Sequence, residues 1–120
     1  GTYLHAADHG FLAPFNPPET WTEHKGDLAL DTPFNFVSTN DIIGGNSGSP
    51  VVNREGELVG VIFDGNRYSL VWGFVYDDEQ GRAVSVDSRA ILEALTKVYS
   101  ATTLVNELRG TKTETVPPSQ

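Results

Sequence analysis

The chain has 120 residues, enough for one domain or part of one, and 38% of them are hydrophobic. Sixteen Asp and Glu residues against eight Lys and Arg residues give a formal net charge of −8, which argues against binding to nucleic acid or to an anionic membrane surface. Cysteine is absent, which excludes disulfides and cysteine nucleophiles, and no apolar run approaches the roughly 20 residues that span a bilayer. Methionine is absent even at position 1, so we expect a chain that was processed or cut from a larger protein.

Residues 1–33 are predicted to be an irregular, Pro-rich connecting segment. Four of the seven prolines lie here, and the apolar residues follow no sustained period. Only residues 19–25 are expected to form a short helical turn, with Trp21 facing inward. A stretch of this length without a pattern is unusual in a self-sufficient domain, so we interpret it as a connection within a larger body.

Residues 34–110 are predicted to form a β-rich body followed by helix. Period-2 or continuous apolar runs favour short strands, and the run at 58–63 is apolar on both faces, which is typical of a buried strand. Gly56 is placed to supply a positive φ in a hairpin turn at 54–57. The predicted strands cover residues 34–39, 50–53, 58–63, 70–76 and 82–86.

The pattern changes to a period of 3.6 after Asp87, which is placed to cap a helix. Leu104 and Leu108 indicate a second short helix, and residues 111–120 are expected to be a flexible tail. The apolar face of the first helix comprises Ile91, Leu92, Leu95, Val98 and Tyr99.

The segment that could carry chemistry is Gly-Gly-Asn-Ser-Gly-Ser-Pro at residues 44–50, in a break between two predicted strands. Glycine admits backbone conformations that are closed to other residues, and it leaves room for a substrate carbonyl to reach backbone N–H groups. In the serine-protease arrangement, the N–H of the nucleophile and that of the glycine two residues earlier form the oxyanion hole. These residues would be Ser47 and Gly45.

Three other interpretations of this loop compete with a nucleophile site. The first is a Gly/Ser-rich turn without a function. A phosphate-binding P-loop is rejected because the segment has no lysine and runs into a strand. The nucleophile elbow of α/β-hydrolases is rejected because position 49 is Ser instead of Gly and no helix follows. The strand–loop–strand context favours a chymotrypsin-like arrangement.

Three segments together carry a resemblance to a known family: residues 39–52 around the serine, Gly-Glu-Leu-Val-Gly at 56–60, and Phe-Asp-Gly-Asn at 63–66. They resemble the S46 peptidases, which are bacterial dipeptidyl aminopeptidases of the dipeptidyl-peptidase 7 and 11 type. Further matches lie at residues 14–21, 32–37 and 86–89. The resemblance spans roughly residues 11–109, nearly the whole chain.

The resemblance implies a mainly β fold, namely the C-terminal β-barrel half of a chymotrypsin-like (trypsin-like) serine protease, with a C-terminal α-helix. It implies that an upstream N-terminal half supplies the catalytic His and Asp, and that an inserted helical domain caps the active site. We therefore expect the C-terminal part of such an enzyme. Alone it should be inactive, because two of the three triad residues are missing.

The resemblance also implies a role for four residues of this chain. Ser47 matches the nucleophile and Gly45 the oxyanion-hole glycine. Asp64 matches an acidic residue that holds the free α-amino group of the substrate, although a turn-forming Asp after a buried strand is the alternative. Gly65 matches the S1-pocket position, where dipeptidyl-peptidase 7-like members have Gly and 11-like members have Arg. Gly65 therefore implies a preference for hydrophobic P1 residues.

Asp41 would suggest a different specificity of the S1 pocket. It lies six residues before Ser47, the offset at which trypsin-like enzymes place an Asp at the floor of the S1 pocket. The resemblance does not support that role. We expect Asp41 to be structural, bonding backbone N–H groups.

The histidines are the only candidates for a general base within the chain, and none matches the catalytic His of the family. His5 and His9 are four apart and could share a metal on a helix. No carboxylate at helical spacing completes such a site, and Gly10 would end the helix. His24 lies outside every matching motif. We therefore expect neither a metal nor an organic cofactor.

The sequence thus predicts part of a serine dipeptidyl aminopeptidase that acts on peptide substrates with a free N-terminus, in the bacterial periplasm or secreted. Two alternatives stay open: a non-catalytic β-rich binding or structural module, and a fragment of a trypsin-like endopeptidase. A lone barrel half has an uncovered interface, so we also expect a possible homodimer through the face that would meet the N-terminal half.

Overall fold

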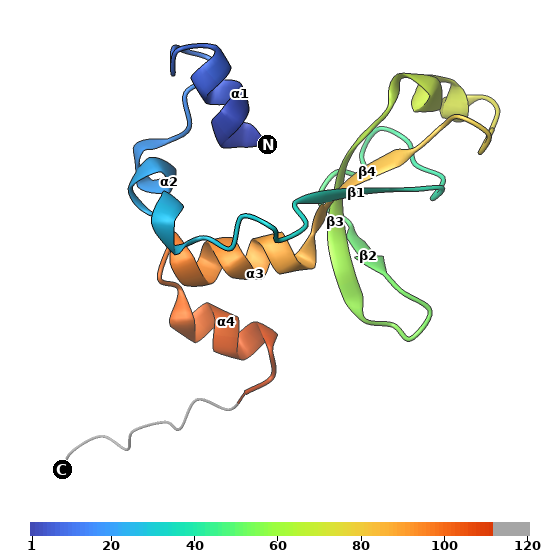
Figure 1. Ribbon diagram of the computed structural model, residues 1–120. Helices are drawn as coiled ribbons and strands as arrows, with labels where there is room; N and C mark the ends of the chain where they lie inside the picture. The colour runs from blue at the N-terminus through green and yellow to red at the C-terminus, as the bar shows by residue number, and fades with distance from the viewer. Residues whose placement is uncertain (112–120) are drawn as a thin grey trace. The chain divides into compact units, whose positions relative to one another are not determined.

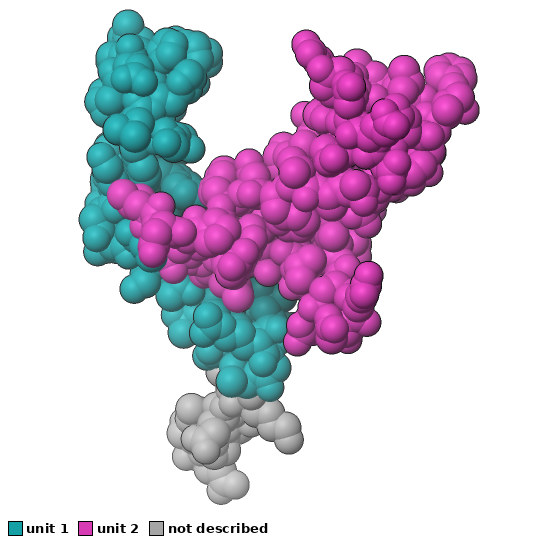
Figure 2. Space-filling view, turned by 45° about the vertical axis from the view of Figure 1, so that its right-hand side comes forward, with its two compact units in different colours: residues 1–29, 94–120 teal, residues 30–93 magenta. Residues whose placement is uncertain are grey.

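A computed structural model describes residues 1–111, which divide into two compact units (Figures 1 and 2). One unit comprises residues 30–93, and the other joins residues 1–29 with the segment from Ala94 onward. None of the helices in residues 1–111 combines the length and the apolar character needed to cross a bilayer. In chain order the elements are α1 (Thr2–Asp8), α2 (Glu19–Glu23), η1 (Lys25–Asp27), β1 (Asn35–Ser38), β2 (Pro50–Val52), β3 (Leu58–Gly65), η2 (Arg67–Gly73), β4 (Ala83–Asp87), α3 (Ser88–Lys97) and α4 (Thr102–Leu108).

The unit of residues 30–93 is built on an antiparallel sheet of four strands in the order β1-β4-β3-β2. β3 is a central strand, paired with β2 on one side and with β4 on the other. Its register against β4 shifts near its end, where Ile62 faces Ser85 but Asp64 already faces Val84. Such a bulge bends a strand and redirects its side chains, and here it lies next to the loop that contains Ser47.

The core of this unit is small. Ile62, Trp72 and Ala83 are buried together, and Ile42 and Val51 pack against them. The Trp72 indole Nε1 also donates a hydrogen bond to the carbonyl of Asp77, at 2.8 Å. The core therefore joins the central strand, the helix η2 and the loop before β2, which are the elements that surround the candidate site.

The predicted strands at 34–39, 50–53, 58–63 and 82–86 are confirmed as β1 to β4, and the helices after Asp87 and around Leu104 are confirmed as α3 and α4. The predicted strand at 70–76 is wrong, because the 3₁₀ helix η2 covers most of it. Asn66 caps this helix by accepting hydrogen bonds from the backbone amides of Tyr68 and Ser69. The chain turns at once after β3, and an apolar run alone does not separate a strand from a helix.

The burial expected for the strands is only partly observed. β3 is buried at Gly60 and Ile62, while Leu58 and Phe63 are 49% and 45% exposed. The described sheet is open, with β1 and β2 at its edges, so the predicted closed chymotrypsin-like barrel is not seen in residues 1–111. Large apolar side chains that are more than half exposed in this unit include Leu30, Phe34, Val37, Ile43, Val52, Leu70, Val71, Phe74 and Val75.

The other unit is helical, and residues 1–33 are less irregular than predicted because α1 and α2 both lie there. Hydrogen bonds link its parts: the Tyr3 hydroxyl donates to the Trp21 carbonyl at 2.6 Å, and the Trp21 indole donates to the Tyr99 hydroxyl at 2.9 Å. Helices of five and seven residues are too short to show a period in the sequence. Of the predicted tail at 111–120, only Thr111 lies within the described residues.

Asp87 fixes the start of α3, as predicted. Its buried carboxylate accepts a hydrogen bond from the Arg89 backbone amide at 2.9 Å, and Oδ2 accepts one from the Arg89 guanidinium at 2.7 Å. The hydrogen bond and the positive charge of Arg89 lower the pKa of Asp87 below its ordinary value of 3.8. A carboxylate with a lowered pKa stabilises the folded state in its ionised form.

We expect Asp87→Ala to lower the free energy of unfolding by about 1 kcal/mol, because the helix loses its N-cap. In the wild-type protein the Asp87 contribution is present above a pH of about 3.8 and is lost as the pH falls through the lowered folded-state pKa. Asp87→Asn retains a capping oxygen and should remove this pH dependence. Thermal unfolding between neutral pH and pH ~3 measures both effects, and equal acid sensitivity in wild type and Asp87→Asn would contradict the assignment.

Candidate functional site

The loop before β2 begins with a turn closed on both sides by Asn46. The Asn46 backbone amide donates to the Ile43 carbonyl at 3.2 Å, and the Asn46 side-chain Oδ1 accepts from the Ile43 amide at 2.8 Å. Gly45 has a φ of 102°, a conformation that residues with a side chain rarely adopt. The turn therefore requires glycine at position 45 and a side chain with a hydrogen-bond acceptor at position 46.

A second turn follows directly and holds Ser47. The Ser49 amide donates to the Asn46 carbonyl at 2.9 Å, and Gly48 has a φ of 90°. Two further hydrogen bonds seat the loop on the central strand: the Gly48 amide donates to the Ile62 carbonyl at 2.8 Å, and the Ile62 amide donates to the Ser49 carbonyl at 3.1 Å. The serine is thus presented by a loop anchored to the sheet.

The backbone amides of this loop fall into two groups. Those of Asn46, Gly48 and Ser49 donate to backbone carbonyls. Those of Gly44, Gly45 and Ser47 donate to no acceptor in residues 1–111, and all three residues are exposed. Free donors beside a nucleophile are what an oxyanion hole requires. This group includes the two amides that the sequence predicted for that role, Gly45 and Ser47, and the role itself stays a prediction.

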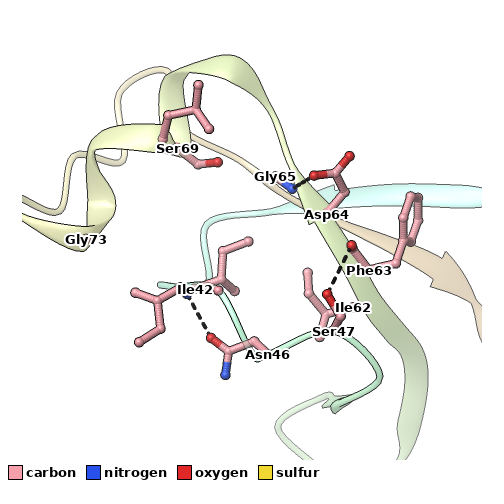
Figure 3. A pocket seen from close by; sticks show the side chains of 12 residues that line it. Ile42, Asn46, Ser47, Ile62, Phe63, Asp64, Gly65, Ser69 and Gly73 are labelled. Atoms are coloured by element: carbon pink, nitrogen blue, oxygen red, sulfur yellow. Dashed lines mark hydrogen bonds between the residues drawn. The ribbon is translucent and has the colours of Figure 1, made fainter.

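Ser47 lies at a pocket of about 330 Å³ (Figure 3). Its Oγ donates a long hydrogen bond of 3.4 Å to the Phe63 carbonyl at the end of β3. The unit of residues 30–93 contains no histidine, so it offers Ser47 no imidazole base. The pocket is lined by Ile42, Ile43, Gly44, Asn46, Ser47, Ile62, Phe63, Asp64, Gly65, Ser69, Leu70 and Gly73.

Asp64 and Gly65, the two predicted substrate-binding residues, both line the same pocket as Ser47. Asp64 is exposed, and its Oδ1 accepts a hydrogen bond from the Gly65 amide at 2.8 Å. Its other oxygen has no hydrogen-bond partner among the described residues, which leaves it available to a cation. Figure 3 shows the carboxylate beside Gly65 at the end of β3.

Asp41 does not join this group. It is exposed, it does not line the pocket, and its carboxylate accepts no hydrogen bond within residues 1–111. The expectation that Asp41 bonds backbone N–H groups is therefore wrong. The exposed loop simply leaves the carboxylate in solvent, and a role at the pocket floor has no support either.

The three histidines lie in the helical unit. His24 contacts Asp27 with 3.1 Å between Nδ1 and Oδ2, and the His9 ring nitrogen Nδ1 lies 2.9 Å from the His5 carbonyl. The rings of His5 and His9 also pack on Phe15. In the part of the chain that the structure describes, no three His, Asp or Glu side chains are grouped so as to hold a metal ion.

Several residues that line the pocket were not predicted from the sequence. Asn46 could have been found, because an asparagine after two glycines is a common turn signal. Ser69 and Leu70 could not, since they reach the pocket only because η2 replaces the predicted strand at 70–76. Ile42 carries no polar signal, and it is placed by packing on the core.

We expect Asn46→Ala to loosen the first turn, because the Ile43 amide loses its acceptor. Hydrogen exchange of the Ile43 amide should accelerate about fivefold to tenfold, as expected for the loss of about 1 kcal/mol of hydrogen bonding. Asn53→Ala is the matched control, since Asn53 closes the β2–β3 turn in a similar way by accepting from the Glu55 and Glu57 amides. Unchanged exchange at Ile43 in Asn46→Ala would refute this account of the loop.

Comparison with known proteins places this chain in a family. The model of the Peptidase S46 family matches residues 1–110. A dipeptidyl-peptidase 7 from Phocaeicola vulgatus is 45% identical over 78 residues, which are 65% of this chain and 11% of the relative. An Asp/Glu-specific dipeptidyl-peptidase from Shewanella putrefaciens is 46% identical over an alignment of 107 positions, which covers 84% of this chain and 15% of that protein.

The fold has a solved counterpart. The crystal structure of Porphyromonas endodontalis DPP11 in complex with the dipeptide Arg-Glu matches with a TM-score of 0.67 and 29% identity, over 79% of this chain and 15% of the other. The described architecture, an antiparallel four-stranded sheet with helices, is thus similar to part of that enzyme. The chain spans 11 to 15% of the length of these relatives. With a family match over nearly all of its residues, the chain belongs to the S46 peptidase family.

Proposed function

We propose that this chain is the nucleophile-bearing part of a serine dipeptidyl-peptidase that releases dipeptides from the free N-termini of peptides. The observation that carries the proposal is the pair of free amides, Gly45 and Ser47, beside an exposed serine at a pocket. The family to which the chain belongs supports the same reaction class.

In the proposed reaction, the Ser47 Oγ attacks the carbonyl carbon of the second peptide bond while a general base accepts its proton. The negative charge that develops on the carbonyl oxygen is stabilised by the amides of Gly45 and Ser47. The peptide nitrogen leaves with that proton, and the acyl-enzyme is then hydrolysed by water. No metal or organic cofactor takes part in this scheme.

The general base belongs to another part of the proposed enzyme. Residues 30–93, which contain Ser47, include no histidine, and a serine hydroxyl is a weak nucleophile without a base. We therefore propose that the catalytic His and Asp come from a preceding region of a longer protein, and that this chain alone is inactive. This arrangement accords with the small share of the relatives that the chain spans.

We propose Asp64 as the residue that selects dipeptides over longer products. A carboxylate at the pocket would pair with the free α-ammonium of a substrate through a charge-assisted hydrogen bond, and Asp64 has one oxygen without a partner in residues 1–111. A fixed distance from Asp64 to Ser47 would then place the second peptide bond at the nucleophile. Binding of the substrate N-terminus by Asp64 would therefore also position the scissile bond.

We propose an apolar P1 side chain, and the lining of the pocket supports this choice. Ile42, Ile62 and Leu70 contribute apolar surface, and among the described residues no Lys or Arg lines the pocket. An acidic P1 group would therefore enter without a cation to pair with, which is unfavourable. The names of the relatives do not decide between the two classes, because dipeptidyl-peptidase 7 and Asp/Glu-specific enzymes both match this chain.

We extend the proposal to the finer fold. The open edges of the sheet and the exposed apolar side chains of residues 30–93 suit one half of a chymotrypsin-like barrel that the rest of a longer protein covers. If a second copy of this chain covers that surface instead, sedimentation of the isolated chain would show a dimer.

For the location of the enzyme we propose the bacterial periplasm or secretion.

In the full-length protein we expect Ser47→Ala to abolish chromophore release from dipeptide amides with a free N-terminus. The expected loss in kcat is about 10⁶-fold, the scale measured when a catalytic serine is removed. Ser49→Ala is the matched control, since its side chain forms no hydrogen bond in residues 1–111 and its activity should stay near wild type. Activity that survives Ser47→Ala would rule out Ser47 as the nucleophile and would favour a non-catalytic role for this part of the protein.

We expect Asp64→Asn to raise KM for free-amine substrates about tenfold or more, because a charge-assisted hydrogen bond contributes roughly 1.5–3 kcal/mol. Asp41→Asn removes a carboxylate that does not line the pocket and should leave KM unchanged. Substrates with an acetylated N-terminus should be poor for the wild type and insensitive to Asp64→Asn. Equal cleavage of free and acetylated substrates by the wild type would instead indicate an endopeptidase.

A further inference from the structure

We propose that Asn66 is a positioning residue that sets the shape of the P1 pocket, and that Ser69 is the specificity-determining residue it holds. The inference rests on the proposed function, because it takes the pocket at Ser47 to be the site for the P1 side chain. Neither residue belongs to the set that the resemblance implied. Both follow from how the end of β3 connects to η2 and β4.

Asn66 uses both ends of its side-chain amide. Oδ1 accepts hydrogen bonds from the backbone amides of Tyr68 and Ser69, both at 3.2 Å, and of Arg82, at 3.1 Å. Nδ2 donates to the Gln80 carbonyl at 2.8 Å. Three donors face one atom and an acceptor faces the other, which fixes the orientation of the amide. One side chain thus fastens η2 and the approach to β4 onto the end of β3.

The backbone of Asn66 strengthens the same junction. Its amide donates to the Arg82 carbonyl at 2.9 Å. Its carbonyl accepts from the Ser69 amide at 3.0 Å and from the Ser69 Oγ at 2.7 Å. The Ser69 hydroxyl is therefore held by the backbone carbonyl of residue 66, and the Ser69 amide is held by that carbonyl and by the Asn66 side chain.

Ser69 in turn fills the space beside Gly65. A Cβ added to Gly65 would lie far inside van der Waals contact with the Ser69 Oγ, and 3.3 Å from Cδ1 of Ile42. Figure 3 shows Ser69 and Ile42 on opposite sides of the pocket next to Gly65. Position 65 therefore has no room for a side chain of its own while Ser69 is in place, and Ser69 borders the pocket at this point.

The chemistry at position 66 is specific for asparagine. An aspartate has the same shape and could accept the three backbone amides, but its second oxygen would face the Gln80 carbonyl without a proton to donate. An alanine would remove all four hydrogen bonds of the side chain, and only the Ser69 amide would keep another acceptor, the carbonyl of residue 66. Because these partners lie on η2 and before β4, the change should reach the pocket through Ser69.

The first test uses the full-length protein and free-amine dipeptide amides that share P2 and differ at P1 (Ala, Leu or Glu). In Asn66→Ala the ratio of kcat/KM for Leu over Ala should fall about tenfold, the scale of losing packing around a methylene or two, with most of the change in KM. Asn66→Asp should lie between wild type and Asn66→Ala. Asn53→Ala, which alters a turn outside the pocket, should keep the wild-type ratio.

The second test decides the role of Ser69 even if Asn66→Ala fails to fold. Gly65→Ala forces a Cβ against the Ser69 Oγ and should lower kcat/KM for the Leu substrate by about tenfold or more, as overpacking does. Adding Ser69→Ala removes that oxygen and should restore most of the activity, a non-additive pair of changes. A role in stability alone would not produce recovery that depends on P1 size.

The possible outcomes distinguish a failure of the roles of Asn66 and Ser69 from a failure of the proposed function. An active wild type whose P1 ratios are the same in a folded Asn66→Ala variant, with thermal unfolding as the check, overturns the role of Asn66. Additive losses in Gly65→Ala with Ser69→Ala overturn the role of Ser69. A wild type that cleaves none of the substrates overturns the proposed function and this inference with it.

Discussion

The candidate site depends on one pair of hydrogen bonds, between the Gly48 amide and the Ile62 carbonyl and between the Ile62 amide and the Ser49 carbonyl. They continue the β2–β3 ladder into the loop that contains Ser47, so the loop takes its position from the central strand. β3, like β4, is paired on both sides, so its backbone is held along both edges. The same strand ends at Asp64 and Gly65, so one element positions both the loop of Ser47 and the pocket.

Two asparagine side chains fix the turns at either end of the candidate site. Asn46 closes the turn before Ser47 and Asn66 closes the junction after Gly65, each by presenting a neutral side-chain amide to backbone groups that have no partner in the sheet. A neutral amide both donates and accepts, and it does not titrate in the physiological range. The shape of the loop and of the pocket should therefore be insensitive to pH. Any pH dependence of catalysis would then report the general base and the carboxylate that meets the substrate, and not a change in the scaffold.

The sequence predicted what depends on local chemistry. The glycines at 45 and 48 indicated a loop with unusual backbone angles and free amides, and the structure gives both residues a positive φ. Strands with a clear period and the helix capped by Asp87 were found for the same reason. The run at 70–76 was misread, because its apolar residues suit a strand or a helix equally well, and the cap at Asn66 acts through partners as distant as Arg82. No sequence pattern indicated Ser69, since it reaches the pocket only because the chain forms η2 after β3.

In the proposed enzyme, residues 30–93 would stabilise the oxyanion and another part would accept the proton, because of the residues that this unit contains and lacks. This unit supplies the serine, the free amides of Gly45 and Ser47 and the residues that line the pocket, but no imidazole. Stabilising an oxyanion and accepting a proton are separate tasks, and a fold built from two parts can assign them to different parts. Leu70 illustrates the consequence, for it lines the pocket and yet is 80% exposed. In the proposed enzyme, a surface of this kind would become a closed site only when a substrate or another part of the protein covers it.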